Sequence, residues 1–204
     1  MSLTTLKTLR SASVATVFGA ALIFSGCSKS DAPKDTPASP AARAKSSNSE
    51  IANKEALLQL IAEFRAAVDA KDYDRVVEIS MPPKFLGYFA EMAGTEPGEM
   101  RTAIVGQMGA IMGQVQSFDY AYDEDNIRFE TLPDGTVFAR MPLDVTMVIA
   151  GKTIKAKDHN IGLKENGKWY LVRVSEPELA RMFKEAYPEF KDTEFAQQQM
   201  VNAE

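Results

Sequence analysis

Three residues stand out because their side chains could take part in chemistry. Cys27 is the only cysteine and His159 the only histidine among the 204 residues, and Asp158 directly precedes that histidine. A lone cysteine could be a nucleophile, a metal ligand, half of an intermolecular disulfide, a buried core thiol, or a residue that never acts as a thiol. The aspartate could serve as an acid or base.

Asp158 is the best catalytic candidate. It has the same parity as Ile154 and Ala156, so we expect it to point to the apolar side of a strand, with His159 pointing outward. A carboxyl group held in an apolar pocket could act as an acid or base. The alternative is structural, with Asp158 and Asn160 satisfying backbone groups that a β-bulge leaves unpaired. We favour the structural role.

The sequence gives little support for a metal site. One histidine, and no cysteine besides Cys27, leaves mainly carboxylates as ligands for a transition metal. Three methionines on one predicted helix face could bind Cu(I), but Ile104 and Ile111 share that face, which is typical of methionines filling an irregular core. These methionines are Met100, Met108 and Met112. We predict no metal and no cofactor.

The residues before the cysteine indicate where the protein resides. Lys7 and Arg10 precede an uncharged, mainly apolar run over residues 12–24. A positive start followed by a short apolar run is typical of a secretory signal peptide. The run is too short to span a bilayer, which takes about 20 apolar residues.

The stretch "LIFSGC" resembles the lipobox of bacterial lipoproteins, in which a bulky apolar residue and two small residues precede an invariant cysteine. Phe24, Ser25 and Gly26 occupy those positions, with phenylalanine where leucine is commonest. In that family the cysteine is diacylated on sulfur, and it becomes the N-terminus after cleavage. The resemblance implies that Cys27 is lipidated and, because Ser28 follows instead of aspartate, that the protein is anchored in the outer membrane, facing the periplasm. An ordinary cleaved signal with a free cysteine is the alternative.

The composition divides the chain into a signal peptide (1–26), a lipidated cysteine with a disordered tether (27–50), one domain (51–190) and a polar C-terminal tail (191–204). Between Cys27 and residue 51 there is no aromatic or branched aliphatic residue, so the tether cannot bury a core. Residues 51–204 keep 17 of the 23 basic and 25 of the 28 acidic residues, a net charge of −8. That charge argues against a nucleic-acid partner.

Helices are predicted first and strands later. A capping box at Ser47 and Glu50 predicts the start of a helix that ends near residue 70. Apolar residues at helical spacing predict further helices over residues 72–79, 85–92 and 97–115, the last with a buried stripe of methionine and isoleucine.

The apolar period then changes to two. Residues 137–149 predict a long antiparallel strand with one apolar face. The neighbouring strands switch parity around residues 123–126 and 158–160, which we interpret as β-bulges. Turns are expected at residues 134–135, 151–152 and 166–167, and a closing helix after residue 175.

This order predicts an α+β fold with N-terminal helices packed on a curved antiparallel sheet. The segments "FRAAVDAKDYDRVVEI" and "LKENGKWYLVRV" resemble the nuclear transport factor 2-like superfamily, a cone-shaped fold shared with ketosteroid isomerases and SnoaL-type cyclases. The resemblance covers residues 51–183 and implies a pocket inside the cone. The tyrosine that the isomerases carry in the first helix has no counterpart in residues 47–70.

We expect Phe64, Met141, Asp158 and Trp169 to line that pocket. No second inward acid, base or nucleophile can be placed, so the predicted function is a noncatalytic envelope protein that binds a small apolar ligand or a protein. The alternative is a small isomerase-, cyclase- or hydratase-like enzyme that uses Asp158. Besides the membrane, a second copy or an envelope protein could bind the outer sheet face, which we expect to expose Phe138, Arg140, Asp144 and Tyr170.

Replacing the cysteine tests the anchor. Cys27→Ala should abolish labelling by a fatty-acid analogue and release the protein from membranes, because the acyl chains would have no attachment site. Metabolic labelling followed by membrane fractionation measures both effects. Labelling that persists in the variant would overturn the assignment.

Overall fold

The computed structural model describes residues 40–201, with side chains from residue 48. The predicted signal peptide, Phe24, Ser25, Gly26 and the lipidation site Cys27 lie outside these residues. Helices precede strands, which confirms the predicted α+β class. The elements are α1 (Pro40–Asp69), α2 (Tyr73–Ser80), α3 (Pro83–Ala93), α4 (Pro97–Met112), β1 (Val115–Tyr122), η1 (Glu124–Asn126), β2 (Arg128–Thr131), β3 (Val137–Ile149), β4 (Lys152–Glu165), β5 (Lys168–Arg173), α5 (Pro177–Ala186), η2 (Pro188–Phe190) and β6 (Gln199–Val201).

Helix α1 starts earlier than predicted. It begins at Pro40, so Ser47 and Glu50 lie inside the helix and the predicted capping box is wrong. Proline suits the first helical turn, and residues 41–50 contain no glycine or further proline that would end a helix. The helix therefore extends into the segment predicted to be a disordered tether.

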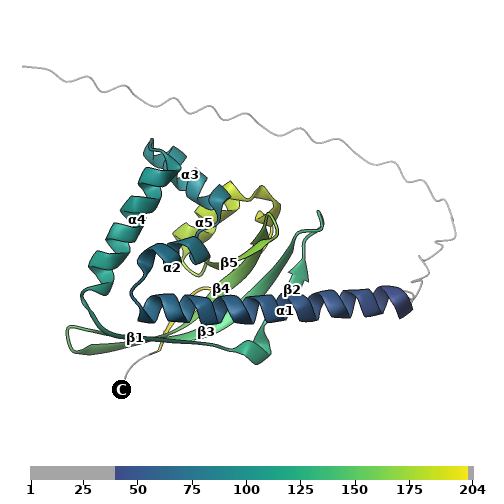
Figure 1. Cartoon of the computed structure of the whole chain (residues 1–204), viewed down its shortest axis with the longest axis horizontal. Helices are drawn as coiled ribbons and strands as arrows, with labels where there is room; N and C mark the ends of the chain where they lie inside the picture. Colours follow the sequence, from purple (N-terminus) through teal and green to yellow (C-terminus); the bar gives the residue numbers. More distant parts are fainter. Residues whose placement is uncertain (1–39, 202–204) are drawn as a thin grey trace, which may run out of the picture. The chain divides into compact units, whose positions relative to one another are not determined.

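The strands form one antiparallel sheet in the order β1-β3-β4-β5, with β2 also paired to β3 and β6 to β4. Figure 1 shows that the sheet is strongly curled, that α1 runs along it, and that α2, α3 and α4 gather at one side. The predicted turn at residues 166–167 is present, with Asn166 and Gly167 both at positive φ. The turn predicted at residues 151–152 lies one residue earlier, at Ala150 and Gly151.

The two predicted bulges are absent. Strands β3 and β4 pair without a register shift from Phe138 opposite Leu163 to Ile149 opposite Lys152. At the other switch the chain leaves the sheet through the 3₁₀ turn η1, and β1 and β2 pair with successive parts of β3. The register shift found in β1 lies between Val115 and Ser117 instead.

The apparent parity switch in β4 has a different cause: both faces of the sheet are covered around residues 161–163. One face, here called the inner face, packs against α1 and includes Ala139, Met141, Trp169 and Leu171. The opposite, outer face packs against α5, η2 and the residues after them. The buried residues of this layer include Phe138, Ile161, Leu163 and Tyr170 of the strands, and Phe183, Phe190 and Phe195 of the segment that covers them.

This outer cover corrects two expectations. Phe138 and Tyr170 are 0% and 6% exposed, so they do not form a free interaction surface. The segment predicted to be a polar tail belongs to the fold, because Phe195 is buried and β6 pairs with Lys155–Lys157 of β4. Phe138, Tyr170 and Phe195 pack in one cluster with apolar residues of α5 and η2. The sequence pattern did not show that these two elements cover the outer face.

Helix α1 packs closely on the inner face at Gly162. A Cβ atom at that position would lie 2.8 Å from Cδ2 of Leu57 and 3.2 Å from Sδ of Met141. A larger residue at this position would have to displace Leu57 and Met141, which are fully buried, so glycine suits this contact between helix and strand. Further along α1, Phe64 and Val68 border a cavity.

Gly162→Ala should therefore destabilise the protein by about 1–3 kcal/mol, because the added methyl group overlaps two buried side chains. Chemical denaturation of the purified protein measures the change in unfolding free energy. Gly106→Ala is the matched control: its Cβ would meet nothing within 4 Å, so it should be neutral or stabilising, since alanine favours helix. Equal stabilities of the two variants would contradict the close approach of α1.

Candidate functional site: a cavity between the sheet and helix α4

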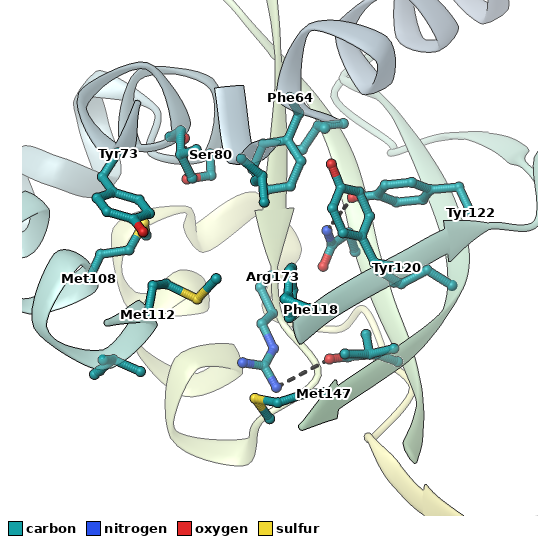
Figure 2. Close-up of a pocket in the computed structure, with 18 of the residues that line it drawn as sticks. Phe64, Tyr73, Ser80, Met108, Met112, Phe118, Tyr120, Tyr122, Met147 and Arg173 are labelled. Carbon is teal, nitrogen blue, oxygen red and sulfur yellow. Dashed lines mark hydrogen bonds and ion pairs between the residues drawn. The ribbon is translucent and has the colours of Figure 1, made fainter. Parts of the chain in front are cut away.

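A cavity of about 540 Å³ lies between the inner face of the sheet and helices α1, α2 and α4. Figure 2 shows aromatic and methionine side chains arranged around it. The lining is mainly apolar, with polar groups from β1, β4 and β5 and from Ser80 of α2, Gln107 of α4 and Gln198. Its principal side chains are Phe64, Tyr73, Met108, Met112, Phe118, Tyr120, Tyr122, Met147, Asp158, Asn160 and Arg173.

Helix α4 forms one wall of this cavity. We predicted that its apolar stripe would be buried, but no residue of α4 is buried and Ile111 is 52% exposed. Ile104, Met108, Ile111 and Met112 line the cavity instead. The helix contacts its neighbours α2 and α3, and Gly109 lies against the ring of Tyr73.

The predicted pocket residues divide into two groups. Phe64 and Asp158 line the cavity, as expected. Met141 is fully buried below α1, and Trp169 packs edge to face on Phe129 at 6.1 Å, so neither lines it. Sequence reasoning missed Arg173, although its parity with Trp169 in β5 was a clue to its inward direction.

Asp158 is engaged by donors of the protein itself. It is 4% exposed, and its Oδ1 accepts the backbone N–H of His159 at 2.7 Å. Its Oδ2 pairs with Nη2 of Arg173 at 3.1 Å and accepts Nε2–H of Gln198 at 3.2 Å. Arg173 also pairs with Glu176, at 3.1 Å. Asp158 lies where β4 passes from pairing with β6 to pairing with β5, so its backbone contact supports the structural role.

Two tyrosines of β1 stand beside this polar end. The rings of Tyr120 and Tyr122 are 6.0 Å apart and nearly perpendicular. The hydroxyl oxygen of Tyr122 accepts Nδ2–H of Asn160 at 2.6 Å, whereas the Tyr120 hydroxyl has no hydrogen-bond partner among the described residues. Burial raises the pKa of Tyr120 to about 12, partly opposed by Arg65, and burial also raises the pKa of Tyr122. Both phenols therefore remain neutral at physiological pH.

His159 points to the outer face, as predicted. It borders a separate cavity of about 230 Å³ together with Arg128 and Arg140, and its Nδ1 has no partner among the described residues. Arg140 pairs with Glu130 at 2.5 Å. Within the part of the chain that the structure describes, no three His, Cys, Asp or Glu side chains are arranged to hold a metal ion.

Comparison with protein-family models, curated proteins and solved structures found no match to this chain. No helix within residues 40–201 is long and apolar enough to cross a membrane. Functional conclusions therefore depend on the sequence and the cavity.

Replacing Asp158 tests whether it is structural. Asp158→Asn should lower the unfolding free energy by about 1–3 kcal/mol, because the buried partner of Arg173 loses its charge. Thermal and chemical denaturation measure this. Glu176→Gln is the matched control: it removes the exposed partner of the same arginine and should cost less than about 0.5 kcal/mol. Stability equal to that of the unmodified protein would show that the Asp158 contacts are not structural.

Proposed function

We propose that the protein is a lipid-anchored protein of the bacterial envelope whose domain binds a small apolar ligand without chemical conversion. The observation that supports this most is the cavity of about 540 Å³, which is apolar and bounded by a helix with no buried residue. Ligand sites are typically mainly apolar cavities of about 300–1,000 Å³ with a few placed polar groups. The cavity fits that description.

Binding is better supported than catalysis. A base needs a side chain that can reach the substrate proton, and both oxygens of Asp158 are already engaged. The other charged side chain of the lining, Arg173, is paired with it. The enzyme alternative would require Asp158 to exchange these contacts for a substrate.

The anchor and the fold family are part of the same proposal. The "LIFSGC" stretch supports lipidation of Cys27, and Ser28 supports outer-membrane retention. The order of helices and strands, with a curled sheet and a cavity below helices, supports the nuclear transport factor 2-like assignment. A protein partner or second copy would have to use the exposed part of the outer face, near Asp144, because Phe138 and Tyr170 are buried.

Ligand retention tests this proposal. We expect the protein purified from its own envelope to retain a small molecule, seen by native mass spectrometry as a mass difference that organic extraction removes. Recombinant ligand-free protein should bind the neutral fluorescent dye N-phenyl-1-naphthylamine in the same cavity.

A charge placed in the cavity should prevent this binding. Met112→Asp puts a short acid in the apolar lining and should weaken dye binding by at least about tenfold, because an unpaired carboxylate is poorly solvated there. Fluorescence titration measures the affinity. Met92→Asp is the matched control, since Met92 is 58% exposed on α3 and lies outside the lining. Unchanged affinity in Met112→Asp would contradict binding in this cavity.

A further inference from the structure

We propose that the ligand is electrically neutral, with a hydrocarbon body and a single hydroxyl or carbonyl oxygen that accepts hydrogen bonds from Tyr120 and Tyr122. This inference rests on the proposed function, because it names the chemical class of the ligand in the same cavity. Three observations support it: the paired charges of the lining, the unused phenol donors, and the apolar wall opposite them.

The charges of the lining exclude ionic ligands. Asp158 and Arg173 are the charged side chains among the residues that border the cavity, and they pair with each other. The second terminal nitrogen of Arg173, Nη1, pairs with Glu176. A carboxylate or phosphate would have to displace Asp158 and leave a buried carboxylate without its cation, which is strongly unfavourable. A cationic ligand would in turn have to displace Arg173.

The hydroxyl groups of Tyr120 and Tyr122 can each donate a hydrogen bond, and no acceptor for either proton is found among the described residues. Tyr120 and Tyr122 are 6% and 7% exposed. The Tyr120 hydroxyl has no hydrogen-bond partner among the described residues. The guanidinium carbon of nearby Arg65 lies 5.7 Å from the centre of the Tyr120 ring, but a guanidinium only donates and cannot accept the phenol proton. Asn160 donates to the Tyr122 oxygen, so the Tyr122 proton is likewise available.

A neutral ligand oxygen would satisfy this end of the cavity. A buried hydroxyl without an acceptor is destabilising, and both phenols keep their protons at physiological pH because burial raises their pKa values. Figure 2 shows Tyr122 reaching toward the interior from β1, and Tyr120 beside it below Phe64. A hydroxyl or carbonyl oxygen can accept from such donors without introducing charge.

The opposite wall fits a hydrocarbon body. Met108 and Met112 of α4 and Met147 of β3 border the cavity away from the tyrosines (Figure 2). Thioether side chains are flexible and adapt to apolar shapes. The ligand would therefore lie with its oxygen at β1 and its body against α4.

Matched displacement ligands test the inference. In full-length Cys27→Ala protein loaded with N-phenyl-1-naphthylamine, 1-decanol should displace the dye at a concentration at least about tenfold lower than decanoate does at pH 8. Tyr120→Phe and Tyr122→Phe should each weaken decanol binding about fivefold and leave decanoate binding unchanged. Tyr120→Phe should also leave the melting temperature of the ligand-free protein equal or higher, since it removes an unpaired buried hydroxyl.

Tyr170→Phe is the matched control, because this tyrosine is equally buried but lies on the outer face. It should change neither displacement curve. If decanoate displaces the dye as well as decanol does, or if both tyrosine variants bind decanol normally, the inference is overturned while the cavity remains a binding site. If the dye does not bind, or if Met112→Asp binds it normally, the proposed function itself fails.

Discussion

The cover on both faces of strand β4 around residues 161–163 is the constraint on which the rest of the structure depends. Leu57 of α1 contacts one face at Gly162, and α5 with its following segment covers Ile161 and Leu163 on the other. A strand buried on both faces cannot slip by one residue without placing polar groups in a core. The uninterrupted register with β3 therefore places Asp158 on the cavity side.

This double cover also explains where the sequence pattern was informative and where it misled. The inward residues of β3 keep one parity throughout, so that strand was predicted correctly. In β4, apolar residues change parity between Ala156 and Ile161, and an inserted residue or a second buried face would give the same pattern. The second explanation, a second buried face, is correct because α5 and Phe195 cover the outer face. Periodicity within β4 cannot show that cover.

For the candidate site, too, the sequence predicted only part of the arrangement. Periodicity shows which residues point inward, but it does not show whether another element covers them. Met141 and Leu143 are two residues apart on the same face, yet Met141 lies below Leu57 and Leu143 borders the cavity. For the same reason the apolar stripe of α4 was predicted to be core, although it faces open space.

That open space has an energetic meaning. Apolar surface left in contact with water forgoes about 25 cal/mol per Å² of burial, so a helix whose apolar stripe stays partly exposed does not maximise stability. The contact of Gly109 with Tyr73 and the short connection from α3 to Pro97 hold α4 beside α2 and α3. Functional sites are commonly kept at some cost in stability. An occupant of the kind proposed, which covers the stripe and accepts the phenol protons, would recover burial and hydrogen bonding together.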